Sequence, residues 1–188
     1  MQRRQFIALL CATLFPATVP AALASVDMQI SVARRGEVFL VDAVFVAPVS
    51  QREAWSVLTD FDGMSRFVPN LDESRIADRD GERLRVEQRG IARWGPLTHA
   101  FTMVRDIQLE PIQQVRSNSV GGTMRQVQSL TQLAAVSGGT EVRHHIEFAV
   151  DTWMPDLLIE PFLRHEVREQ FEAVVAEMLR RRASGGAH

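Results

Sequence analysis

The feature that most constrains this chain is a run of short extended segments between Leu71 and Asp151, each ended by a tight-turn sequence. The turn sequences are Asp80-Gly81, Trp94-Gly95-Pro96, Glu110-Pro111, Gly121-Gly122 and Gly138-Gly139. The predicted strands between them are 71–79, 82–93, 97–109, 112–120, 123–136 and 140–151. Successive strands joined by tight turns predict an antiparallel meander.

One more strand and two short helices are predicted before this meander. Glu37 to Ala47 is apolar and β-branched, which is typical of a largely buried strand, and Pro48 ends it. Ser50 and Glu53 have the spacing of a capping box, so a helix is expected to begin there. A second short helical piece is expected to end before Pro69.

The last predicted element is a long helix from Asp156 to Arg182. Apolar residues and one histidine recur mostly at steps of three and four, which is the pattern of one wide helix face. These residues are Leu158, Phe162, His165, Val167, Phe171, Val174, Met178 and Leu179. The order of strand, two short helices, six strands and one long helix predicts an α+β protein.

The first 24 residues have the pattern of an export signal. Arg3 and Arg4 precede an apolar run, Phe6 to Val19, that ends near the small-residue site Ala22 to Ala24. We therefore expect cleavage after Ala24 and a periplasmic protein, exported by the general secretory route or, given the paired arginines, by the twin-arginine route. Cleavage would remove Cys11, the single cysteine, so no disulfide or thiol chemistry is expected.

Composition excludes several kinds of chemistry. Lysine and tyrosine are absent and all 21 basic residues are arginine, so neither a Schiff-base lysine nor a tyrosine acid is available. A formal net charge of −2, more negative after loss of the signal, does not suit nucleic-acid binding. The expected organisation is a signal at 1–24, a polar lead-in at 25–36, one domain at 37–182 and a tail at 183–188.

Two local segments resemble a known superfamily. They are Val46-Ala47-Pro48 followed by Ala54 to Phe61, and then Phe67 to Leu71. These segments, together with the order of elements, resemble the START-like polyketide cyclase/dehydrase and lipid-transport superfamily, and most closely its coenzyme Q-binding branch. The resemblance implies a helix-grip fold, with a seven-stranded antiparallel sheet wrapped around the C-terminal helix. It also implies an apolar ligand held between sheet and helix, although some members are cyclases or hydrolases.

Strand alternation places a few polar side chains on faces that are otherwise apolar. His144 shares a face with Val142, Ile146 and Phe148, and the same argument turns Gln88 and His99 inward. In 123–136 either Met124 and Gln126 face inward or, if a bulge reverses the order, Arg125 and Val127 do. A buried polar group without a partner costs about 1–3 kcal/mol. These groups must therefore form hydrogen bonds with each other, with bound water or with the polar head of a ligand.

A cavity open toward the two short helices is therefore expected, and with it a binding or transport protein for a lipid, isoprenoid quinone or similar hydrophobic small molecule. No cofactor is expected, and the oligomeric state is left open. The predicted ligand-contacting residues are His99, Phe101, Met103, Met124, Gln126, His144, Phe148, Leu158, Phe162 and Phe171.

Other interpretations of the same residues remain open. An enzyme would use a pair such as His144 with Asp106 or Glu147, and a structural protein would have a closed interior. A metal site of His99, His144 and His165 is disfavoured, because the three lack the close spacing of metal motifs.

An arginine stripe, interleaved with Glu87, is expected on the outer face of one strand. Such a stripe could contact anionic lipid headgroups transiently. More often, a stripe of this kind is a sheet face that is exposed to solvent. The stripe consists of Arg83, Arg85, Arg89 and Arg93.

Overall fold

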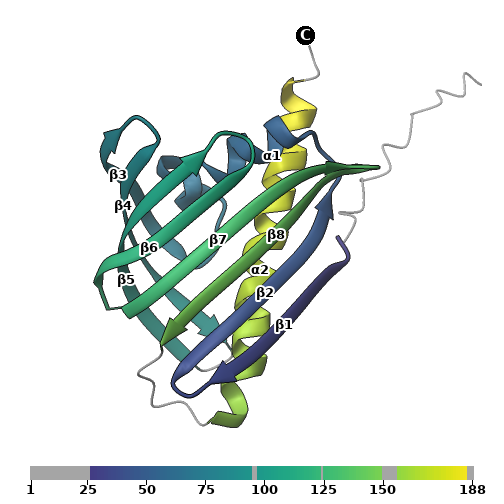
Figure 1. Cartoon of the computed structure of the whole chain (residues 1–188). Helices are drawn as coiled ribbons and strands as arrows, with labels where there is room; N and C mark the ends of the chain where they lie inside the picture. Colours follow the sequence, from purple (N-terminus) through teal and green to yellow (C-terminus); the bar gives the residue numbers. More distant parts are fainter. Residues whose placement is uncertain (1–25, 95–96, 124, 150–155, 186–188) are drawn as a thin grey trace, which may run out of the picture.

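The computed structural model describes residues 26–94, 97–123, 125–149 and 156–185, which form one curved antiparallel sheet around one long helix (Figure 1). The strand order is β1-β2-β8-β7-β6-β5-β4-β3. The strands are β1 (Met28–Arg35), β2 (Val38–Ala47), β3 (Leu71–Asp80), β4 (Arg83–Trp94), β5 (Leu97–Glu110), β6 (Gln114–Gly122), β7 (Arg125–Val136) and β8 (Gly139–Ala149). The helices are α1 (Gln51–Leu58), the short 3-10 helix η1 (Phe61–Arg66) and α2 (Asp156–Gly185).

The predicted helix-grip fold is confirmed, with an eighth strand in addition. Residues 28–35 form β1, where the sequence pattern predicts a polar lead-in and hence a seven-stranded sheet. Met28 is buried, and Ile30 and Val32 pack against the core. Gly36, at a φ of +63°, occupies the turn that returns the chain into β2. The intervening polar residues Gln29 and Ser31 are exposed because they point to the opposite face of the sheet.

The first short helix follows the sequence prediction closely, whereas the second begins earlier and ends earlier than expected, at Phe61 and Arg66. The Ser50 side chain accepts a hydrogen bond from the backbone N–H of Glu53, and the Glu53 carboxylate accepts one from the backbone N–H of Ser50, which completes the predicted capping box. Ala54, Val57 and Leu58 are the buried residues of α1. The second short element is the 3-10 helix η1, which Asp60 caps by accepting a hydrogen bond from the backbone N–H of Gly63.

Helix α2 lies across the concave face of the sheet (Figure 1). Its buried apolar side chains form the core with β2 and β8. They are Ile159, Leu163, Phe171, Val174, Val175 and Met178. The predicted helix face is correct except at its margin, where His165 is exposed. None of the described helices has the length and apolarity that a membrane span requires.

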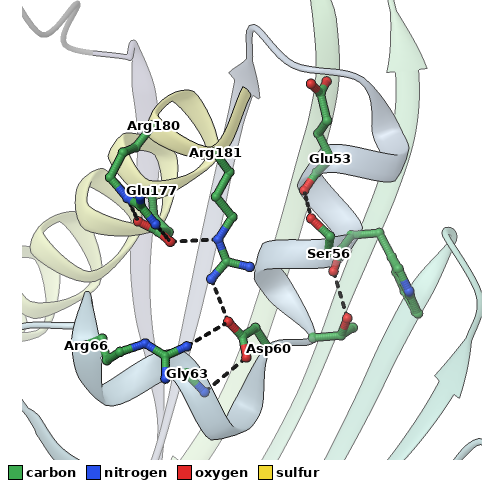
Figure 2. A network of polar contacts seen from close by, with 10 residues as sticks. Glu53, Ser56, Asp60, Gly63, Arg66, Glu177, Arg180 and Arg181 are labelled. Atoms are coloured by element: carbon green, nitrogen blue, oxygen red, sulfur yellow. Dashed lines mark hydrogen bonds and ion pairs between the residues drawn. The ribbon is translucent and has the colours of Figure 1, made fainter. Parts of the chain in front are cut away.

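The C-terminal end of α2 is tied to the junction between α1 and η1 by an ion-pair network (Figure 2). The Arg181 Nη2 atom lies 2.5 Å from Asp60 Oδ2, and its Nε donates to Glu177 Oε1 over 2.6 Å. Arg180 donates two further hydrogen bonds to the Glu177 carboxylate. These hydrogen bonds lower the pKa of Glu177 to about 2, against the opposing effect of burial. The network therefore fixes one end of the helix on the rest of the fold.

Candidate functional site

The sheet and α2 enclose a cavity of about 320 Å³. Its walls are mainly apolar and come from β3 to β8, from α2, and from α1 and η1 at one end. Prominent apolar lining residues are Phe101, Met103, Val127, Phe148, Phe162 and Phe171. A concave apolar space with a few polar groups is the usual form of a small-molecule site.

A band of polar side chains crosses the cavity wall from strand to strand. Its members, in strand order, are Gln88 on β4, Arg105 on β5, Ser117 on β6, Ser129 and Thr131 on β7 and His144 on β8. The register supports the band, because Ser117 pairs with Ser129 and Thr131 pairs with His144 on neighbouring strands. Apolar lining lies on either side of it along β5, with Met103 before Arg105 and Ile107 after it.

Arg105 brings a positive charge into this cavity. Its Nη2 atom donates to Gln88 Oε1 over 2.6 Å, and Gln88 is itself oriented by donating from Nε2 to Ser74 Oγ over 2.9 Å. Burial lowers the pKa of Arg105 to about 10, so the guanidinium remains charged at neutral pH. Within the described parts of the chain, no carboxylate is found to offset this charge, and Arg105 Nε has no hydrogen-bond partner.

His144 lies in the same cavity and is neutral. Burial, followed by the positive charge of Arg105, lowers its pKa to about 4. Its Nδ1 atom is 2.8 Å from Thr131 Oγ1, and its ring makes an edge contact with Phe171 at a centroid distance of 5.1 Å. When the Thr131 hydroxyl donates to Nδ1, the imidazole carries its proton on Nε2.

Glu166 is the acidic residue of the α2 wall. Its Oε2 atom accepts a hydrogen bond of 2.8 Å from Asn70 Nδ2, while Oε1 is buried without a partner. Burial and the neighbouring Glu169 raise the pKa of Glu166 to about 7. Over the described residues, Arg105 Nε and Glu166 Oε1 are the two buried side-chain atoms that lack a partner, and both residues line this cavity.

The cavity reaches the surface between the start of β5 and the middle of α2. Thr98 and His99 of β5 and Gln170 of α2 are its exposed lining residues. At the other end, the lining residues Leu58 and Phe61 are buried. The opening therefore lies away from the short helices. The sequence argument expects it beside them, but the lining residues at that end are buried under α1 and η1.

Seven of the ten predicted ligand-contacting residues line this cavity. They are His99, Phe101, Met103, His144, Phe148, Phe162 and Phe171. Gln126 does not, because a bulge between Arg125 and Gln128 gives Gln126 a φ of +53° and turns its side chain to solvent. The alternative parity is correct, since Val127 faces inward.

The other two predicted residues also lie outside the set that lines the cavity. Leu158 is one helical turn before Phe162, the first residue of α2 in the described lining, so it sits beyond the end of the cavity. Met124 lies outside the described residues.

Sequence reasoning missed the two charged groups of the site, Arg105 and Glu166. The strand and helix periodicities used for the other site residues also place these two side chains on the inward faces. Arg105 follows Phe101 and Met103 at two-residue steps on β5, and Glu166 follows Phe162 by four residues on α2. Residue type opposes the inward assignment of Arg105, because an arginine side chain is normally expected on the solvent side.

The alternative catalytic pairs do not form around His144. Asp106 instead accepts two hydrogen bonds from Arg85 on the outer face, and Glu147 contacts His145. Nor do the three candidate metal-binding histidines come together in the described structure. The group with closely placed ligand atoms is His165, Glu166 and Glu169, within 4.8 Å of one another, and both carboxylates accept hydrogen bonds from Asn70.

Part of the arginine stripe is neutralised on the outer face of the sheet. Arg85 pairs with Asp106 and Arg89 with Glu73, while the interleaved Glu87 pairs with Arg75. These contacts fit the solvated-face interpretation.

Solved structures from several bacteria share this fold. An aromatase/cyclase, Zhui, from Streptomyces sp. R1128 is 14% identical, with a TM-score of 0.65 over 77% of this chain and 95% of that chain. A STAR-related lipid transfer protein from Xanthomonas axonopodis is 12% identical, with a TM-score of 0.63 over 79% and 98%. A START superfamily protein from Mycobacterium smegmatis is 12% identical, with a TM-score of 0.61 over 75% and 97%. At these identities the likeness establishes the fold alone.

No curated protein matches the sequence significantly. The family described as polyketide cyclase / dehydrase and lipid transport, however, matches residues 47–175, which is more than half of the chain. This range runs from the end of β2 through most of α2 and includes every strand and helix that lines the cavity. The chain therefore belongs to the polyketide cyclase/dehydrase and lipid-transport family.

Proposed function

We propose that this protein is a periplasmic binding or transport protein for a hydrophobic small molecule, such as a lipid or an isoprenoid quinone. The observation that carries the proposal is the apolar cavity of about 320 Å³ between the sheet and α2, which reaches the surface beside His99 and Gln170. Binding would come from burial of apolar surface, at about 25 cal/mol per Å² before the costs of association. The family supports a hydrophobic ligand without naming one.

Native mass spectrometry of the gently purified protein tests this proposal directly. We expect a bound hydrophobic molecule, and saturable binding of an apolar fluorescent probe after the protein is stripped of ligand. Ser129→Phe places a bulky ring in the cavity and should abolish binding, whereas Gln128→Phe, on the exposed side of the same strand, should not. Repeated absence of any bound or added apolar molecule would count against the proposal.

A cyclase-type enzyme is the second candidate, because the cavity also holds a neutral imidazole beside a buried cation. In the tautomer whose Nδ1–H donates to Thr131, the neutral His144 could accept a proton from a bound substrate on Nε2, while Arg105 would stabilise the negative charge that develops. His144→Ala should then abolish turnover of an added polyketide-like substrate while leaving its binding largely unchanged. Equal binding with no turnover in the wild-type protein would favour the transport function.

The periplasmic part of the proposal rests on the sequence of residues 1–24. Fractionation of cells that express the full chain should place the processed protein in the periplasm, with an N-terminus at Ser25. Arg3→Lys together with Arg4→Lys would distinguish the two export routes, because twin-arginine export depends on the paired arginines.

A further inference from the structure

We propose that the ligand is a carboxylic acid whose ionised head lies against Arg105 in the middle of the cavity, with its apolar body along Met103 and Phe101 toward the opening. This inference rests on the proposed function and narrows it from hydrophobic molecules in general to acids. It is carried by one juxtaposition: the Arg105 guanidinium, which no carboxylate of the described residues is found to offset, belongs to the lining of an apolar cavity that is large enough for a ligand.

The charge of the cavity selects for a single negative charge. A buried cation without a counter-ion is costly to the folded protein, and a ligand that supplies the anion recovers that cost on binding. His144 is neutral in the same polar band and adds no second positive charge, and Glu166 on the α2 wall, whose pKa is raised to about 7, is mostly neutral below that pH. A dianionic phosphate head would leave one negative charge uncompensated in an apolar wall, so a monoanion fits better.

The geometry of the band suits a carboxylate. Gln88 accepts one hydrogen bond from Arg105 Nη2, which uses one of the five N–H donors of the guanidinium. A carboxylate has two acceptor oxygens and pairs well with a guanidinium edge. The Ser117 and Ser129 hydroxyls also line this part of the cavity and can donate to the same head. A neutral quinone carbonyl would accept hydrogen bonds but would not neutralise Arg105.

The position of Arg105 along β5 sets the direction of the ligand. Arg105 is six residues beyond the exposed His99, which is roughly 20 Å along an extended strand. The inward-facing residues between them, Phe101 and Met103, are apolar. The acid head therefore enters first and the apolar body fills the space toward the opening.

The test compares acids with neutral molecules of the same shape. Binding of dodecanoate and 1-dodecanol, and of anthracene-2-carboxylate and anthracene-2-methanol, is measured by displacement of an apolar probe or by calorimetry at pH 6, where Glu166 is mostly protonated and both acids are mostly ionised. We expect at least one acid to bind about tenfold or more tightly than its alcohol, the increment of a buried charge-assisted contact. The aliphatic pair represents a fatty acid and the aromatic pair a polycyclic aromatic acid, so a comparison of the two pairs shows which kind of acid the cavity prefers.

Variants assign the preference to the buried guanidinium. Arg105→Gln should bring acid and alcohol to within about threefold of each other, and Arg105→Lys should retain part of the preference. Arg116→Gln, one residue before Ser117 on the exposed side of β6, is the matched control and should leave the preference intact. Circular dichroism and unfolding curves confirm that each variant is folded.

Each outcome bears on one of the two proposals. An acid preference that disappears in Arg105→Gln supports the inference. Equal binding of acid and alcohol, a preference that survives Arg105→Gln, or tighter binding of decylubiquinone than of either acid overturns it while hydrophobic binding stands. If none of these probes binds the wild-type protein, the proposed function fails as well.

Discussion

Arg105 and His144 share one cavity, and the positive charge of Arg105 adds to burial in keeping the His144 imidazole neutral. Of these two basic groups, the cavity therefore holds one as a fixed positive charge and the other as a neutral imidazole, rather than two cations. Arg105 lies on β5 and His144 on β8, with β6 and β7 between them, so the two groups occupy different parts of the same cavity wall. Both the stability and the ligand selectivity of the protein should depend on this arrangement.

The unpaired charge of Arg105 should reduce the stability of the ligand-free protein. Arg105→Met keeps a long side chain but removes the charge and the partnerless Nε atom, so we expect the free energy of unfolding to rise by about 1–3 kcal/mol. Urea unfolding of the ligand-free proteins measures this change. Arg116→Met, at an exposed site, is the control and should change stability by less than about 0.5 kcal/mol. A loss of stability in Arg105→Met would mean that Gln88 compensates the guanidinium fully.

His144 should make the protein less stable in mild acid. Its pKa is about 4 in the folded state and 6.5 as a model value, so the unfolded chain binds a proton between these pH values that the folded chain does not. Stability should therefore fall as the pH drops from about 6.5 to about 4, by about 3 kcal/mol at most. His144→Gln should lose this component of the pH dependence, whereas replacement of the exposed His165 by Gln should retain it. Urea unfolding at several pH values, with NMR titration of the His144 ring, measures both quantities.

Glu166 should give the opposite pH dependence, with the stability of the protein falling as the pH rises. Its pKa is raised from 4.5 to about 7, so the folded chain holds a proton that the unfolded chain has lost. The stabilisation is complete below pH 4.5 and disappears as the pH rises through about 7. Glu166→Gln should therefore be more stable than the wild type at pH 8 by about 1–2 kcal/mol, after allowance for partial solvent screening.

Glu172→Gln is the control for this prediction, because Glu172 lies on the exposed side of α2 beside Arg168. Its stability should follow the wild-type curve from pH 5 to pH 8. Identical pH dependence of the Glu166→Gln and wild-type proteins would show that the carboxyl titrates near its usual pKa.

The sheet could be predicted from the sequence because its determinants are local. Turn sequences rich in glycine or proline and two-residue alternation define the hairpins without reference to the rest of the fold. Gly81 and Gly138 do have positive φ, as such turns require. Strand β1 was missed because its outward residues are polar and its inward residues Ile30 and Val32 are only half-buried, so its apolar signal is weak.

The site was less predictable because it depends on contacts between distant parts of the chain. The bulge at Gln126 reverses which residues of β7 face inward, and nothing in the local sequence decides between the two parities. The neutral state of His144 and the raised pKa of Glu166 are consequences of enclosure by both sheet and helix. Residue type even misleads at Arg105, whose side chain would be assigned to solvent.

The ion pair between Asp60 and Arg181 should contribute measurably to stability. Asp60→Asn removes the negative charge that Arg181 contacts while keeping a side chain that can still cap η1, and we expect a loss of about 1–2 kcal/mol. Asp106→Asn breaks the exposed pair with Arg85 and should cost less than about 1 kcal/mol. Urea unfolding measures both changes, and hydrogen exchange should localise the Asp60→Asn effect to the last turns of α2. Equal effects of the two substitutions would show that the partly buried network adds nothing beyond a surface pair.

The close approach of β4 to the chain that precedes β3 requires glycine at position 90. A Cβ atom there would lie 2.0 Å from the backbone oxygen of Asn70 and 2.8 Å from Phe101 Cζ. That oxygen also accepts a hydrogen bond from the backbone N–H of Ile91, so the two segments cannot separate without losing it. Gly90→Ala should therefore destabilise the protein by about 1–3 kcal/mol, as overpacking does.

Gly121→Ala is the matched control, because its Cβ would make only an ordinary contact with Val104 at 3.5 Å. Urea unfolding of both variants should separate them clearly. Since the Asn70 side chain donates to Glu166, displacement of Asn70 in Gly90→Ala should also change the pKa of the Glu166 carboxyl, which carbon-detected NMR can follow. Equal stability of the two variants, with an unchanged Glu166 titration, would show that β4 can move outward at this point without disturbing the cavity wall.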